Sequence, residues 1–290
     1  MSVPVRTTVS AVLIALSCLL APCGALAAWA AYGLADTDRY VTAMAPLSAD
    51  PDVRAAVADG LGAQVLAELG RRLGPQAGQV RATVAPLVRD AARSFTRTET
   101  FRVAWDATNR AVHTAVLRAL RDDRPGTGPV TVDLTPVAAR VQARLTGAPV
   151  PARTVITVLP AREVPGLRKG YHVLDTAALW LPLAAVVFAV AGITVAACRR
   201  RALTATGLGT ALGGALLAAA IALGRVLTLA DLPPDLNGPA AGAVYDALTA
   251  PLRSASWLLL ALGLTVATTA WLTGRRPSTE PPPEQERTRA

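Results

Sequence analysis

The chain has 290 residues, of which 52% are hydrophobic and 17% charged, and its formal net charge is +9. Its apolar share exceeds the roughly 45–50% of soluble domains. Together with a mean hydropathy of +0.39, this share is high for an ordinary soluble domain. A positive charge of this size in a soluble protein would indicate nucleic acid as a partner. In a membrane protein, the meaning of this charge depends on the side of the bilayer on which each charged residue lies. We expect no nucleic acid as a partner here.

Four stretches of the chain contain no Asp, Glu, Lys, Arg or His. A helix of about 20 residues spans the roughly 30 Å hydrocarbon core of a bilayer. The sequence therefore predicts a mainly α, polytopic α-helical membrane protein with about four spans and a small extracytoplasmic α+β domain. We expect the spans at residues 9–33, 176–198, 202–224 and 255–273.

Basic residues beside the predicted spans indicate the orientation. Arg6 precedes the first span, the triplet Arg199–Arg201 separates the second from the third, and Arg275 and Arg276 follow the fourth. Short basic segments remain in the cytoplasm. We therefore expect residues 1–8, the turn 199–201 and a disordered tail at 274–290 to be cytoplasmic, and residues 34–175 and the loop 225–254 to be extracytoplasmic.

The first span is consistent with two interpretations. Ala25-Leu26-Ala27 resembles a signal-peptidase site, whereas the apolar run continues to Leu34 and exceeds the usual signal-peptide core of about 7–15 residues. An uncleaved signal anchor is favoured, with cleavage as the alternative. All three cysteines lie in or at the ends of spans, so we expect residues 34–175 to fold without disulfides.

Helix signals open the external segment. Asp50-Pro51 predicts an N-cap followed by proline at the first helical position, and Gly74-Pro75 predicts the end of that helix. A second helix is expected from Gln76 to about Arg93, and a third is expected to begin at a Thr98 cap and run to about Arg121. Apolar residues at helical spacing predict buried stripes formed by Val53, Val57, Leu61, Val65, Leu69 and Leu73 on the first helix and by Val80, Val84, Leu87 and Ala91 on the second.

The rest of the external segment predicts strand, helix and strand. Residues 130–134 and 154–159 are rich in β-branched side chains and flank a short helix within 135–147. Such a crossover predicts a parallel β-α-β unit. Later in the chain we expect apolar pieces of the loop 225–254 to lie near the outer interface, and Gly209 and Gly213 to pack against a neighbouring span rather than to dimerise.

Several motifs of the external segment and the spans resemble a known group of proteins. They are Asp36-Thr37-Asp38-Arg39-Tyr40-Val41, Ala45-Pro46-Leu47, Asp50-Pro51, the series Phe101, Trp105, Asn109, Arg110 and His113, and a span ending in an arginine triplet. Together they resemble uncharacterised multi-pass integral membrane proteins of high-GC actinobacteria, and a single lysine, Lys169, fits such codon usage. The resemblance implies an envelope location with a large extracytoplasmic loop after the first span. It implies no activity or ligand.

Catalytic patterns are weak. Glu99, Asp106 and His113 are spaced by seven residues, about 10 Å along a helix, against a hydrogen-bond reach of about 3 Å. A solvated face with Asp106 paired to Arg110 is favoured. Two histidines and no external cysteine supply no metal set, and phosphate-loop, nucleophile-elbow and zinc-protease motifs are absent from the sequence. We therefore expect no catalytic residue, metal or cofactor.

Two groups of residues are candidates for binding. Trp105, Asn109 and His113, at positions i, i+4 and i+8, could form the polar corner of a pocket, although a role in satisfying backbone groups is favoured. Residues 34–175 contain 19 basic and 14 acidic side chains. Because arginine binds phosphate bidentately, a basic face could contact anionic lipid headgroups or wall polymers, with a merely solvated surface as the favoured alternative. This face would comprise Arg71, Arg72, Arg89, Arg93 and Arg97.

The function expected from these observations is that of a non-catalytic envelope protein in interaction, sensing or scaffolding, with an envelope protein as a further partner besides the lipid bilayer. A transporter or transporter subunit is the alternative. It is less favoured because the spans contain no ionisable residue that could couple an ion. An enzyme ranks last.

Overall fold

The computed structural model describes residues 3–74, 77–121, 130–135, 139, 155–159, 161–162, 164–233 and 236–273. Four helical stretches are long and apolar enough to cross a membrane, so the chain is a mainly α, multi-pass membrane protein. The first joins α1 (Val3–Ala28) to the π-helix η1 (Trp29–Leu34), and the others are α7 (Val164–Val195), α8 (Arg199–Ala230) and α9 (Gly238–Leu272). The predicted tail 274–290 lies outside the described residues.

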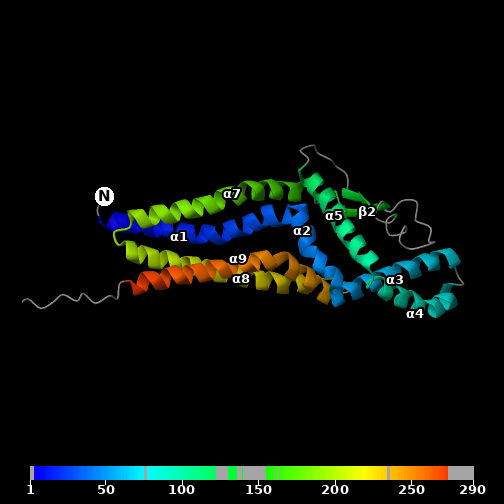
Figure 1. Ribbon diagram of the computed structural model, residues 1–290. Helices are drawn as coiled ribbons and strands as arrows, with labels where there is room; N and C mark the ends of the chain where they lie inside the picture. Colours follow the sequence, from blue (N-terminus) through cyan, green and yellow to red (C-terminus); the bar gives the residue numbers. More distant parts are fainter. Residues whose placement is uncertain are drawn as a thin grey trace, which may run out of the picture.

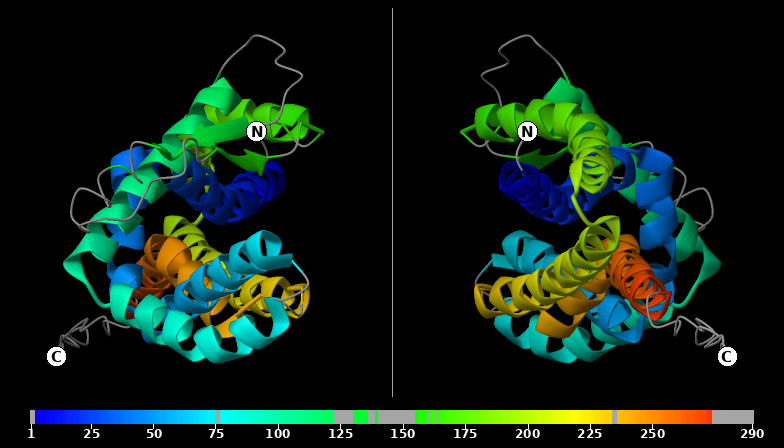
Figure 2. Two further views of the ribbon diagram at one scale, coloured as in Figure 1. Left: turned by 90° about the vertical axis from the view of Figure 1, so that its right-hand side faces the viewer. Right: turned by 90° about the vertical axis from the view of Figure 1, so that its left-hand side faces the viewer.

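The long helices form two pairs, α1 with α7 and α8 with α9, and α1 also packs against α8. Figure 1 shows both pairs running side by side, and the end-on views of Figure 2 show one pair above the other. We call the elements between η1 and α7 the head. They lie at one end of the bundle, opposite the turn between α7 and α8 (Figure 1).

Glycine residues bring the spans into close contact. A Cβ atom at Gly207 would lie 2.7 Å from the carbonyl oxygen of Gly263, and one at Gly214 would lie 2.7 Å from the carbonyl oxygen of Ser256. On another side of α8, a Cβ at Gly209 would overlap the Cys18 sulfur and one at Gly213 would lie 3.1 Å from the Cys18 carbonyl oxygen. The prediction that Gly209 and Gly213 pack within the molecule is confirmed, and α1 is the helix that they meet.

Polar side chains satisfy backbone carbonyls between the spans. Ser10 and Ser17 of α1 each donate to a carbonyl of α7 at 2.7 Å. At the end of the bundle away from the head, Arg6 donates to Val195 O at 3.3 Å, and Arg200 donates to Ala270 O and Trp271 O at 2.9 and 2.8 Å. The last carbonyls of a helix lack intrahelical partners and carry a partial negative charge, so these arginines stabilise the ends of α7 and α9.

The predicted loop 225–254 consists mainly of the end of α8 and the start of α9. α8 continues to Ala230 and α9 begins at Gly238, where the Asn237 side chain accepts from Ala240 N at 3.2 Å. Two apolar residues of this segment pack against the head, where Val244 and Leu248 contact a buried cluster of Met44, Leu47, Val53 and Ala240. This cluster joins the head to α9.

The head begins with α2 (Thr37–Met44), the 3-10 helix η2 (Ala45–Ala49) and α3 (Pro51–Leu73), followed by α4 (Ala77–Phe95) and α5 (Glu99–Arg121). The predicted caps are confirmed. Asp50 accepts from the N–H groups of Asp52 and Val53, and Thr98 accepts from that of Phe101. Gly74, with φ of 59°, ends α3 in a conformation that favours glycine. α3 and α4 thereby form a hairpin that projects from the bundle (Figure 1).

The buried face of this hairpin differs from the predicted stripes. The buried residues of α3 are Val53, Ala58, Gly62 and Leu66, and small residues at the centre of this face allow α4 to approach. Four of the larger apolar residues of the predicted stripes remain exposed, because the two helices meet on another face. Their exposed fractions are 52% for Val65, 39% for Leu73, 41% for Val80 and 69% for Leu87.

Strands β1 (Val130–Asp133) and β2 (Val155–Leu159) pair in an antiparallel ladder, with Val132 opposite Ile156. The predicted parallel β-α-β unit is therefore wrong. An antiparallel pair requires only that the chain reverse, whereas a parallel pair requires a complete crossover. The predicted helix within 135–147 lies almost wholly outside the described residues. The described head is helical apart from this strand pair.

A substitution of Gly263 tests the close contact between α8 and α9. Gly263→Ala places a methyl group against the backbone of Gly207 and Ala211, and overpacking of this kind costs about 1–3 kcal/mol. We expect a lower melting temperature of the full chain in detergent. Gly60→Ala is the matched control, because nothing lies within 4 Å of its Cβ position and alanine favours a helix. Equal melting temperatures for the two variants would contradict the contact.

Candidate functional site

Trp105, Asn109 and His113 lie along one face of α5, toward α2. The Trp105 indole donates to Met44 O at 2.9 Å, at the last residue of α2. The Asn109 amide donates to Trp105 O at 2.9 Å and accepts from the Tyr40 hydroxyl at 3.4 Å. The three predicted residues are therefore brought together as one line that holds α2 against α5.

His113 joins α5 to the end of the first span. Its Nε2 lies 2.7 Å from Leu34 O, and its Nδ1 lies 3.1 Å from the Thr37 hydroxyl. Since a carbonyl only accepts, Nε2 carries the proton and the Thr37 hydroxyl donates to Nδ1 of the neutral ring. The ring also stacks on Tyr40, with centroids 4.2 Å apart. Burial lowers the pKa of His113, and the positive charge of Arg121 acts in the same direction.

These bonds give the line from Trp105 to His113 a structural role. The backbone carbonyls that Trp105 and His113 satisfy belong to the end of α2 and to the end of η1. Arg110 pairs with Asp38, to which it donates at 2.6 Å, instead of with the expected Asp106. This ion pair adds another link from α5 to α2, beside the histidine.

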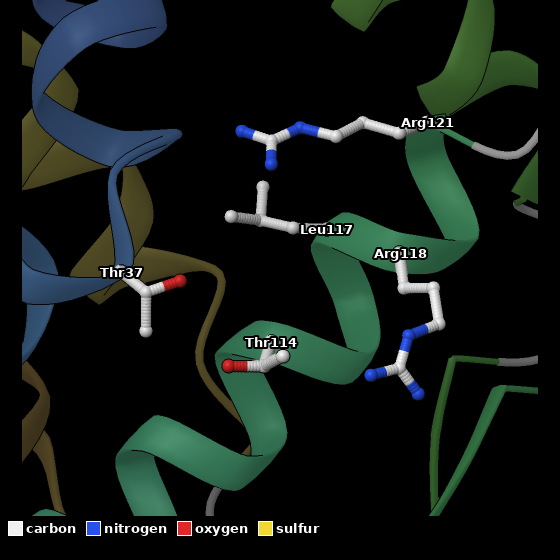
Figure 3. A pocket seen from close by; sticks show the side chains of 5 residues that line it. All are labelled: Thr37, Thr114, Leu117, Arg118 and Arg121. Atoms are coloured by element: carbon white, nitrogen blue, oxygen red, sulfur yellow. The ribbon is translucent and has the colours of Figure 1, made fainter.

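A cavity of about 410 Å³ lies between α2 and the C-terminal half of α5 (Figure 3). It is lined by Thr37, Thr114, Leu117, Arg118 and Arg121. Figure 3 shows Thr37 and Thr114 facing each other, with Leu117 and Arg121 extending above them and Arg118 along the other rim. Thr114, Arg118 and Arg121 share one face of a helix, which was the available signal in the sequence, but their partner face on α2 was not evident.

Arg121 is held by three contacts at the edge of this cavity. Its Nη2 donates to Ala35 O and its Nε to the Tyr171 hydroxyl, both at 2.9 Å, and its guanidinium lies 5.9 Å from the Tyr171 ring centroid. Ala35 directly follows the first span, and Tyr171 precedes the second predicted span by five residues. Arg121 therefore links α5 to the ends of two membrane helices.

A second cavity, of about 440 Å³, lies between η1, α2 and α9. Its lining is mostly apolar and includes Trp29, Tyr40, Leu248 and Pro251. The Trp29 indole donates to Leu248 O at 3.0 Å, in a turn of α9 where Pro251 interrupts the helical hydrogen bonds. This bond joins the first span to the fourth.

The five arginines of the predicted basic face do not form one cluster. All are exposed, and Arg71 and Arg72 both pair with Glu68, the latter at 2.7 Å. These two lie at the free end of the hairpin, whereas Arg93 and Arg97 lie at its base, about 20 Å away at 1.5 Å per helical residue. Among the described residues, no three His, Cys, Asp or Glu side chains are placed to hold a metal ion.

The protonation of His113 should make the stability of the junction depend on pH. Its folded pKa lies below the ordinary 6.5, so the unfolded chain binds more protons near that pH and stability falls as pH decreases through the folded pKa. We expect the melting temperature of the full chain to fall between pH 7.5 and pH 5.5, and to fall less in His113→Gln, which keeps an N–H donor. The same fall in both proteins would exclude His113 as the titrating group.

No protein-family model, no curated protein and no solved structure matches this chain. The architecture is established by the structure, whose four long apolar helices are those of a multi-pass membrane protein. The functional conclusion therefore comes from the chain's own residues and their geometry.

Proposed function

We propose that this chain is a non-catalytic membrane protein of the cell envelope that acts in interaction, sensing or scaffolding through its head. The observation that carries the proposal is the hairpin of α3 and α4, which projects from the bundle and leaves large apolar side chains exposed. Val65, Val80 and Leu87 are between 41% and 69% exposed. Large apolar side chains exposed on a projecting element favour a contact with a protein.

Charge supports the same role. Arg71, Arg72 and Arg89 are exposed on the same hairpin, and arginine combined with apolar side chains is enriched at protein interfaces. Because Glu68 already neutralises part of the charge at the hairpin tip, the surface favours a protein partner in the envelope. Anionic wall polymers are the alternative contact.

The orientation that this role requires places the head outside the cytoplasm and both termini inside. In support, Arg6 and Arg200 lie at the end of the bundle opposite the head, and the positive-inside rule places such residues in the cytoplasm. The strand pair β1 and β2 belongs to the same extracytoplasmic domain, which we propose to be of the α+β class.

Transport is less well supported. The predicted spans contain no ionisable side chain, and the backbones of α8 and α9 are in close contact at Gly207, Gly214 and Gly263. Ion-coupled carriers bind their ions and substrates at charged groups or broken helices near the middle of the bilayer. Arg225 and Asp246, the charged pair between α8 and α9 at 3.2 Å, lie outside the predicted spans, and a closely packed bundle fits a support for the head better.

Site-specific cross-linking tests the contact surface. A photoreactive amino acid at Val65 or Leu87 of the full chain in native membranes should yield a defined adduct with an envelope protein, since these side chains are exposed on the hairpin. Asp59, exposed on another face of α3, is the matched control position. Equal or absent adducts at all three positions would contradict the proposal.

Accessibility to a membrane-impermeant thiol reagent tests the orientation. In a variant whose three native cysteines are replaced, Leu87→Cys should react in intact cells, because the hairpin faces the exterior. Arg201→Cys should react only after the membrane is permeabilised. The reverse pattern would overturn the proposed topology.

A further inference from the structure

We propose that the cavity between α2 and α5 binds a phosphate group, supplied by the headgroup of an anionic membrane lipid. The site is separate from the hairpin and independent of its role. It combines two guanidinium groups and a hydroxyl around one hollow at the level where the spans end. The lining residues that carry the chemistry are Arg118, Arg121 and Thr114.

The first requirement is a fixed positive charge. Arg121 is anchored through Nε and Nη2 by Tyr171 and Ala35, but neither partner is a carboxylate. Within the described part of the chain, no ion pair engages Arg121 or Arg118. A guanidinium that is held by neutral partners keeps its full charge and its remaining N–H groups for a ligand, and arginine matches the geometry of phosphate oxygens.

The second requirement is a group of donors that can close on the ligand. Arg118 is exposed on the rim of the cavity, and the Thr114 hydroxyl faces the hollow (Figure 3). Among the described residues neither side chain has a hydrogen-bond partner, so a ligand can recruit both without breaking a bond. Together with Arg121 they offer donors from three positions on one face of α5.

At the described start of α2, the two carboxylates near the cavity have other partners. Asp36 caps α2 by accepting from Arg39 N at 2.9 Å, and Asp38 pairs with Arg110 at 2.6 Å. Neither Asp36 nor Asp38 therefore pairs with Arg118 or Arg121.

The position of the cavity selects the source of the phosphate. Arg121 bonds to Ala35, the residue that follows the first span, and to Tyr171, which precedes the second predicted span. Aromatic and arginine side chains at such positions lie in the headgroup layer of a bilayer. A cavity of about 410 Å³ is within the size range of small-ligand sites and admits a phosphate with its glycerol. A lipid at the edge of the bundle can therefore place its phosphate in the cavity while its chains remain in the bilayer.

Binding titrations of the purified full chain in detergent test the site. Dihexanoyl phosphatidylglycerol is the anionic probe, dihexanoyl phosphatidylcholine the zwitterionic one, and inorganic phosphate the free anion. Arg118→Gln should weaken binding of phosphatidylglycerol about tenfold, the effect of one charge-assisted hydrogen bond, with an unchanged melting temperature. Arg102→Gln, on the same helix but paired with Glu99 at 2.7 Å, should change it less than about twofold.

Each outcome either tests whether the site exists or identifies the source of the phosphate. Sensitivity to Arg118→Gln for phosphatidylglycerol alone identifies a lipid headgroup, and the same sensitivity for inorganic phosphate identifies a free phosphate. Equal binding by the wild type and Arg118→Gln overturns the site. Equal affinity of the wild type for both lipids overturns it as well. Arg121 is left intact because it also links α5 to the spans.

Discussion

Close backbone contact between the spans is the constraint on which the rest of the structure depends. In a bilayer, packing leucine against leucine gains nothing over packing it against lipid, so helices associate through near approach of their backbones and a few hydrogen bonds. Gly207, Gly214 and Gly263 supply that approach between α8 and α9, and Ser10 and Ser17 supply hydrogen bonds between α1 and α7. The pairs thus formed fix the ends on which the head stands.

The head is attached to this bundle by polar contacts around one short helix. α2 lies between the first span and α5, and α5 reaches it through Trp105, Asn109 and His113, while Arg121 reaches past it to Ala35. On the opposite side, Trp29 donates to Leu248 O of α9. The bonds of Trp105, Arg121 and Trp29 satisfy backbone carbonyls at helix ends or near a proline. The bonds of Asn109 and His113 to Tyr40 and Thr37 join side chains and so fix the position of α2.

Two kinds of surface lie at different distances from the ends of the spans. The hairpin of α3 and α4 extends away from the bundle with apolar side chains exposed, which suits contact with a protein. The cavity lined by Arg118 and Arg121 lies beside the span ends, which suits contact with the bilayer. A lipid bound there would bridge α5 to the membrane surface and so act on the same element that holds α2.

The sequence by itself determined the features that depend on local chemistry. Uncharged stretches of about 20 residues predict spans because of the thickness of the bilayer, and the caps at Asp50 and Thr98 fix helix starts because their side chains bond to neighbouring N–H groups. Only the tertiary structure decided which face of α3 is buried, that β1 and β2 run antiparallel, and that Thr37 of α2 lines one cavity with Arg118 and Arg121 of α5. These depend on contacts between residues distant in the chain, which the periodicity of apolar residues does not reveal.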